Sequence, residues 1–260
     1  LTSLLRVDPV FCLDHIEFID EVLKEALKSH EPIPLSAASS VLGAFNKHFQ
    51  FAAADYIRML LAELQLPYPL ESRRTIYEAL YVLLDLVDDF DCLSYVAQLS
   101  STIQKSEIYL YASLLALALE SHPFDEQSTE IWRVVISTGD LYLILRTAEA
   151  LLIKEKSIVN QILGEVHPLI CSAFVEEGHD SLRMVIDFLR LIVNEFEVDY
   201  AEQFYPRVME LTEVPFLKSS ALALLSKSDN YIPFVVEGLS TCESDEYVIE
   251  AIHNIAQKVS

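Results

Sequence analysis

The chain has 260 residues, and 52% of them are apolar, which is enough material for a continuous hydrophobic core. Its 5 glycines and 10 prolines are too few for the many tight turns of an all-β protein, and no glycine-rich turn of a doubly wound nucleotide-binding fold is present. The 40 acidic and 18 basic residues give a formal charge of −22, which repels nucleic acid and anionic lipid. The same charge fits either simple solubility or attraction of a basic partner.

The cysteines and the apolar runs point to an intracellular protein. Cys12, Cys92, Cys171 and Cys242 lie more than 70 residues apart and form no CxxC pair, so we expect small buried side chains rather than disulfides. The longest nearly uninterrupted apolar run, 108–119, is shorter than the about 20 residues that span a bilayer. We therefore expect a cytoplasmic or nuclear protein without membrane insertion. Residue 1 is Leu rather than Met, which fits a fragment of a longer chain.

The first third of the sequence predicts helices separated by proline-rich breaks. Asp8-Pro9 opens an apolar-periodic segment that runs to Leu27, because proline suits the first helical turn. Glu31-Pro32-Ile33-Pro34 reads as the break that ends it. Two more helices are expected over 36–49 and 52–66, and the second ends at Pro67-Tyr68-Pro69.

Several segments carry apolar residues on two sides of one helix. In the helix predicted over 71–88, one stripe contains Ile76, Leu80, Leu83 and Val87, and a second contains Tyr77, Tyr81 and Leu84. A stripe this wide indicates a helix packed on two sides, and the same holds for 109–119 and 182–193. Further helices are expected over 93–104, 106–120, 127–137, 141–154, 157–175, 179–196, 200–211, 216–226, 232–239 and 246–259.

Three proline-led helix pairs recur in the C-terminal hundred residues. Each begins with a proline near the start of a first helix, at Pro168, Pro206 and Pro233, and continues through a polar turn into a second helix rich in Ala, Leu and Ile. This pattern resembles the HEAT repeat family, although the proline spacings of 38 and 27 residues (206 − 168 and 233 − 206) make the period irregular. The resemblance covers the last hundred residues, and elsewhere only paired helices are present.

The resemblance implies an all-α protein, a right-handed α-α superhelix (HEAT/armadillo-like solenoid) of about thirteen helices in a single domain over 1–260. In such proteins one helix pair cannot bury both of its apolar faces, so pairs stack and leave a concave surface for a ligand. The implied function is a non-catalytic scaffold or adaptor that binds a protein segment. A chaperone cofactor or a transport receptor would share this fold and differ only in its partner.

Acidic and aromatic residues supply the candidate binding site. Ten acids and three arginines lie between Glu176 and Glu213, so a Lys/Arg-rich segment is a fitting partner if these acids line the concave face. If they lie on the convex face, they only solubilise it. The candidate partner-binding residues are Asp85, Asp88, Asp89, Asp91, Glu195, Glu197, Asp199, Tyr200, Phe204 and Tyr231.

An all-helical Mg²⁺-dependent enzyme is the competing hypothesis. Asp85, Asp88 and Asp89 fall on one helix face and offer oxygen ligands, as in the DDxxD run of isoprenoid synthases, but here the order is DxxDD and no second metal motif follows. We expect an acidic helix end instead, with no cofactor and no catalysis. Arg73 and Arg74 open the same helix and fit either a clamp for a carboxylate or a phosphopeptide, or a solvated first turn.

Overall fold

The computed structural model describes residues 14–87, 93–101, 103–175, 178–196 and 199–259. Within these ranges every regular element is a helix, and the predicted all-α class is confirmed. Contacts divide the chain into two compact units, Leu1–Trp132 and Arg133–Ser260, and the boundary falls inside one helix, α9 (Glu126–Ser137). Each unit is described by itself.

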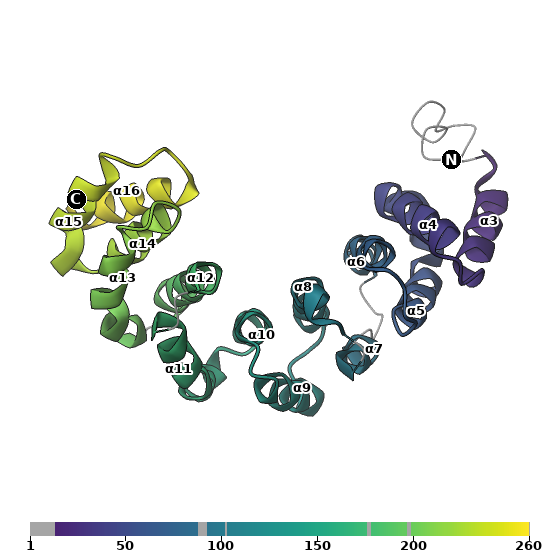
Figure 1. Ribbon diagram of the computed structural model, residues 1–260, viewed down its shortest axis with the longest axis horizontal. Helices are drawn as coiled ribbons and strands as arrows, with labels where there is room; N and C mark the ends of the chain where they lie inside the picture. The colour runs from purple at the N-terminus through teal and green to yellow at the C-terminus, as the bar shows by residue number, and fades with distance from the viewer. Residues whose placement is uncertain (1–13, 88–92, 102, 176–177, 197–198, 260) are drawn as a thin grey trace. The chain divides into compact units, whose positions relative to one another are not determined.

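In the described part of unit 1, the α-helices before α9 are α3 to α8 (Figure 1). Helices α4, α6 and α8 pack side by side in sequence order, while α3 packs on α4 and α5, and α5 and α7 each pack on the helix that follows. Helices α4 and α6 are in contact at Gly43, where an added Cβ would lie 3.7 Å from the Ala79 Cα, an ordinary van der Waals distance. The α-helices are α3 (Ile16–Lys28), α4 (Pro32–Ala44), α5 (Ala53–Glu63), α6 (Leu70–Leu84), α7 (Leu93–Gln98) and α8 (Ile108–Ser121), and the 3₁₀ helices are η1 (Asn46–Ala52), η2 (Leu99–Ser101) and η3 (Lys105–Glu107).

Unit 2 repeats this two-layer arrangement. Helices α10, α12, α14 and α16 pack one on the next, and α11, α13 and α15 each pack on the helix that follows (Figure 1). The pairs α11–α12, α13–α14 and α15–α16 correspond to the three proline-led segments of the sequence. The α-helices are α10 (Leu141–Lys154), α11 (Val159–Val175), α12 (His179–Glu195), α13 (Tyr205–Leu211), α14 (Lys218–Leu225), α15 (Ile232–Leu239) and α16 (Glu246–Val259), and the 3₁₀ helices are η4 (Lys156–Ile158), η5 (Asp199–Phe204) and η6 (Asp229–Tyr231).

The prolines do not all occupy the position expected for them. Pro206 and Pro233 lie in the first turn of α13 and α15, as predicted, because that turn has backbone N–H groups without an intrahelical acceptor. Pro168 instead lies inside α11. Pro32 was expected in a break, but it begins α4 after an extended cap at Glu31 (φ −96°, ψ 129°). A helix-opening proline and a helix-breaking one look alike in the sequence.

The doubly packed helices are largely confirmed. Helix α6 contacts α4, α5 and α8, and α12 contacts α10, α11 and α14. Tyr77 and Leu84 of the second stripe are buried, whereas Tyr81 is 48% exposed. The predicted second stripe is therefore interrupted at Tyr81, its middle member, where α6 faces solvent.

One segment, Lys156–Val175, is long and apolar enough to cross a membrane by length and composition alone. A core helix of a globular protein meets the same criteria, and within unit 2 α11 buries Ile162, Val166 and Ile170. The sequence search for an uninterrupted apolar run found 108–119 and passed over Lys156–Val175. The latter segment is longer and apolar on average, but isolated polar residues interrupt it. The expectation of no membrane insertion stays a prediction.

Candidate functional site

The carboxylates proposed for Mg²⁺ are only partly described by the structure. Asp85 is the exposed residue that caps the C-terminus of α6. Asp88, Asp89, Asp91 and the acidic Glu197 lie outside the described residues. Among the residues that are described, no group of three or more His, Cys, Asp or Glu side chains is placed to hold a metal ion. The metal-enzyme hypothesis rests on Asp88 and Asp89 and stays untested.

Glu195 borders an apolar groove between the C-terminal ends of α10 and α12. The groove has a volume of about 350 Å³. This α10–α12 groove is lined by Leu152, Ile153, Lys156, Leu191, Glu195 and Phe196.

Lys156, a lysine of the chain itself, lies at one side of the α10–α12 groove. Lys156 Nζ lies 3.1 Å from Glu195 Oε2 and 5.5 Å from the centre of the Phe196 ring. Both members of the ion pair are more than half exposed, at 59% and 51% of their side-chain surface. The groove therefore combines apolar walls, an aromatic face and a carboxylate at the surface of unit 2.

The apolar wall of this groove was not proposed from the sequence, although a signal for it exists. Leu151, Leu152 and Ile153 are consecutive at the end of α10. Successive residues of a helix point about 100° apart, so three in a row cannot all face one core. Leu151 and Leu152 are buried, and Ile153 is 56% exposed.

Tyr200 and Phe204 pack against α11 from the short helix η5. Phe204 stacks on Phe174 with ring centres 5.4 Å apart, and it also contacts Tyr200 and His167. The Tyr200 hydroxyl lies 3.2 Å from His167 Nδ1. Burial, followed by the charge of Cys171, raises the pKa of Tyr200 above its ordinary value of 10.

The remaining predicted residues lie around the start of α13. Asp199 is exposed at the first position of η5. Tyr231 packs edge to face on Tyr205, with ring centres 5.5 Å apart. Burial, with smaller effects from Glu202 and Asp199, raises the pKa of Tyr205 to about 12. The structure thus pairs Tyr200 with Phe204, and Tyr231 with Tyr205.

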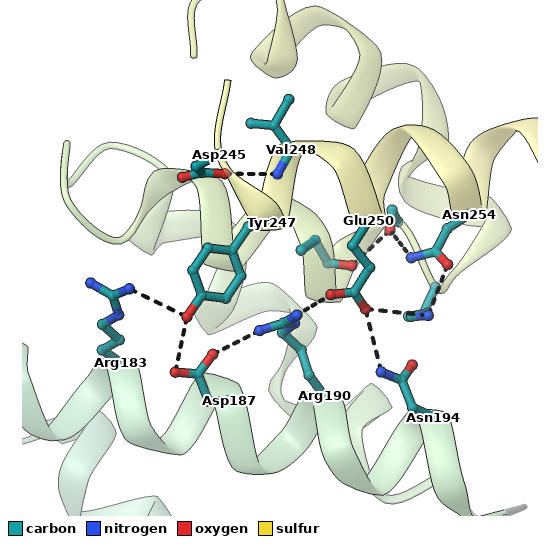
Figure 2. A network of polar contacts seen from close by, with 12 residues as sticks. Arg183, Asp187, Arg190, Asn194, Asp245, Tyr247, Val248, Glu250 and Asn254 are labelled. Atoms are coloured by element: carbon teal, nitrogen blue, oxygen red, sulfur yellow. Dashed lines mark hydrogen bonds and ion pairs between the residues drawn. The ribbon is translucent and has the colours of Figure 1, made fainter. Parts of the chain in front are cut away.

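A polar network joins α12 to α16 across one face of unit 2 (Figure 2). Arg190 is its centre: Nη1 donates to Asp187 Oδ1 at 2.8 Å, Nη2 donates to Glu250, and the guanidinium carbon lies 4.4 Å from the Tyr247 ring centre. Tyr247 in turn accepts from Arg183 Nη2 and donates to Asp187 Oδ2, each at 3.3 Å. Arg190 therefore has one carboxylate partner on its own helix and one on α16, while its buried Nε has no hydrogen-bond partner among the described residues.

The network continues along α16 through Glu250 and Asn254. Asn194 Nδ2 donates to Glu250 at 3.3 Å, and Lys227 Nζ contacts both Glu250 and the Asn254 side chain, at 3.5 and 2.8 Å. Burial alone would raise the pKa of Glu250, but the hydrogen bond and charge of Arg190, aided by Asn194 and Lys227, hold it below its ordinary value. The α12–α16 network therefore consists of Arg183, Asp187, Arg190, Asn194, Lys227, Tyr247, Glu250 and Asn254.

A larger pocket of about 570 Å³ adjoins the Arg183 end of this network. Its wall carries cations and carboxylates together, and Lys218 Nζ donates to Thr241 Oγ1 at 2.7 Å. Because both signs of charge are present, the wall favours no one ligand charge. The charged and aromatic groups that line it are Arg183, Glu213, Phe216, Lys218, Glu243 and Asp245.

Arg73 in unit 1 is a structural residue. It is 2% exposed, and its Nε donates to Glu107 Oε1 at 2.5 Å, while Nη1 donates to the carbonyls of Leu64 and Leu66. Neither the solvated first turn nor the clamp for an external carboxylate therefore describes Arg73. Arg74 is exposed and pairs with Glu78 on its own helix. The 34-residue separation of Arg73 and Glu107 hides their pairing in the sequence.

Comparison with protein-family models, with curated proteins and with solved structures found no match to this chain.

Proposed function

We propose that the chain is a non-catalytic scaffold or adaptor of the α-solenoid type that binds a protein segment in the α10–α12 groove. The segment carries an apolar anchor residue next to a lysine or arginine. The observation that carries the proposal is the groove itself, an apolar recess at the surface with an acidic residue and an aromatic face beside it. The repeated packing of helix pairs in each unit supports the solenoid assignment.

The groove suits a few side chains of a partner rather than a whole domain. Its volume of about 350 Å³ is near the lower end of the about 300–1,000 Å³ of ligand pockets. Burying a large apolar side chain there contributes about 1.5–3 kcal/mol. An apolar anchor therefore supplies affinity, and the neighbouring charge supplies orientation.

Lys156 indicates which charge the partner carries. The ammonium group of this lysine already lies over Phe196 and beside Glu195, so the position accepts a basic group. An exposed pair of this kind contributes only about 0–1 kcal/mol, so a partner cation can replace Lys156 at small cost. An acidic partner would instead meet Glu195 and the charge of −22 on the chain.

The charge balance supports a basic partner as well. The 40 acidic residues exceed the 18 basic ones by 22 (40 − 18). The excess raises the local concentration of cationic segments and their association rate.

A selection from a library of random 12-residue peptides, displayed on phage and captured by the full chain, tests the proposal. We expect enrichment of peptides in which a large apolar residue neighbours Lys or Arg. The enriched peptides should lose binding to an Ile153→Asp variant, because the new carboxylate lies in the groove.

The matched control is Ile249→Asp on α16, which makes the same chemical change at another exposed isoleucine (63% exposed) outside the groove lining. This variant should bind the enriched peptides normally. The proposal is wrong if no sequence class is enriched, or if the two variants bind the peptides equally well.

A further inference from the structure

The central part of α11 places a thiol and an imidazole one helical turn apart. Cys171 is exposed, and its Sγ lies 3.5 Å from His167 Nε2. Residues four apart share a helix face, so the backbone itself sets this distance. A cysteine and a histidine within hydrogen-bonding reach are the first two parts of an activated nucleophile.

The third part is a group that orients the histidine, and Tyr200 supplies it. Its hydroxyl lies 3.2 Å from His167 Nδ1, and its ring meets the imidazole edge to face with centres 5.9 Å apart. Phe204 contacts the same imidazole from the next turn of η5. The ring is therefore fixed by two aromatic neighbours, with Nε2 directed at the sulfur.

The contact with the Tyr200 hydroxyl leaves His167 Nε2 free to face the sulfur. Burial raises the pKa of Tyr200, and the charge of Cys171 raises it further, so the phenol stays protonated at neutral pH and is able to donate to His167 Nδ1. When the hydroxyl donates to Nδ1, the imidazole carries a hydrogen on Nε2. That N–H points at Cys171 and stabilises negative charge on the sulfur.

Cys242 shows the contrasting environment in the same unit. It is half-buried, and its Sγ donates to the Gly238 carbonyl at 3.5 Å. A carbonyl acceptor favours the protonated thiol, which is not the nucleophilic form. The two cysteines therefore form an internal comparison.

We propose that Cys171 is a reactive thiol that forms a mixed disulfide with a low-molecular-weight disulfide, with His167 and Tyr200 as positioning residues. Cys171 releases its proton to solvent, and the thiolate attacks one sulfur of the disulfide RSSR. The Cys171–sulfur bond forms as the S–S bond of RSSR breaks, and the leaving thiolate takes a proton from solvent to give RSH. Cys171 is oxidised and the departing half of RSSR is reduced, so no further oxidant is needed. This site is independent of the α10–α12 groove.

The test uses the full chain and cystamine, a small disulfide, with peptide mapping by mass spectrometry to follow each cysteine separately. Rates are measured at neutral pH for the folded chain and for the chain unfolded in guanidinium chloride, which gives each cysteine its own reference. We expect Cys171 to react about tenfold faster in the folded chain than in the unfolded one, because the neighbouring imidazole favours the reactive thiolate. Cys242 should react more slowly when folded.

Variants separate activation from simple exposure. His167→Ala should remove most of the acceleration at Cys171. Tyr200→Phe, which keeps the ring and loses the hydroxyl, should remove part of it. His253→Ala, which alters an exposed histidine of α16, should leave the rate unchanged. Circular dichroism melting confirms that each variant is folded.

The proposal is overturned if Cys171 reacts no faster in the folded chain than in the unfolded one. It is also overturned if folded His167→Ala and Tyr200→Phe chains react at the wild-type rate, because exposure alone would then explain the reactivity. Loss of peptide binding in the groove has no bearing on either result.

Discussion

At the scale of single residues, Arg73 and Glu107 form an ion pair whose two side chains are only 2% and 0% exposed. Arg73 was placed in a solvated turn or a clamp, yet it is buried against Glu107. Pairing of this kind depends on which helices become neighbours, and a pattern along the chain does not contain that information. Tyr200 and Phe204 were proposed for their aromatic character, and their contact with His167 likewise depends on how η5 folds back on α11.

The Arg73–Glu107 pair leads to a residue-level prediction. Glu107→Ala should lower the free energy of unfolding by about 3–5 kcal/mol, because it leaves a buried guanidinium without its counter-charge. Replacing both partners with apolar residues should cost much less. Urea unfolding monitored by circular dichroism measures both changes.

Arg74→Ala, which alters the residue next to Arg73 on α6, is the control. Its ion pair with Glu78 is exposed, so the loss should stay within about 0.5 kcal/mol. Equal losses for Glu107→Ala and Arg74→Ala would contradict the structural role of the buried pair.

At the level of elements, most helices were predictable and their exact beginnings were not. Apolar periodicity placed α10, α15 and α16 correctly, because caps and turns such as Asp140 and Gly139 bound them clearly. It misplaced α4, whose opening prolines look like a break. The α10–α12 groove was missed because it exists only between two helices, although Glu195 at its edge was among the predicted residues.

Two exposed glycines give a matched prediction about helix ends. Gly139 follows α9 with φ 68°, and Gly164 lies inside α11; an added Cβ would meet nothing within 4 Å at either one. Gly139→Ala should destabilise the chain by about 1 kcal/mol, because a side chain strains the left-handed conformation. Gly164→Ala should stabilise it by about 0.5–1 kcal/mol through helix propensity. Thermal unfolding measures both, and changes of the same sign would refute the assignment of Gly139 as a helix-terminating residue.

The α12–α16 network makes stability depend on pH. The pKa of Glu250 is lower in the folded chain than its ordinary value of 4.5, so its contribution is fully present above that value and is lost as the pH falls through the folded-state pKa. Glu250→Gln should therefore cost about 1.5 kcal/mol or more at pH 7, and the deficit should shrink as the pH falls below about 4.5. Urea unfolding at a series of pH values measures the difference.

Glu237→Gln on α15 serves as the reference for this experiment, since Glu237 is exposed and lies outside the network. Its difference from wild type should stay small at every pH. A Glu250→Gln deficit that is constant from pH 7 to pH 3 would contradict the role given to Arg190.

For the whole molecule, charge sets the expectations about partners. The charge of −22 is a property of composition, so the sequence alone predicts which ligands are repelled. The apolar anchor site needs the structure, because Leu152 comes from the end of α10 whereas Leu191 and Phe196 come from the end of α12. Together these two features define the proposed partner as an apolar residue beside a basic one.

The most direct test of this proposal is a calorimetric titration of the best enriched peptide into the full chain at about 50 and 500 mM NaCl. Salt shortens the screening length from over 10 Å to a few Å, so the electrostatic part of the affinity should fall by about fivefold or more, while the apolar anchor retains measurable binding. Ile153→Asp should abolish the remaining binding at both salt concentrations, and Ile249→Asp should not. An affinity that is independent of salt, together with equal binding by both variants, would contradict the account.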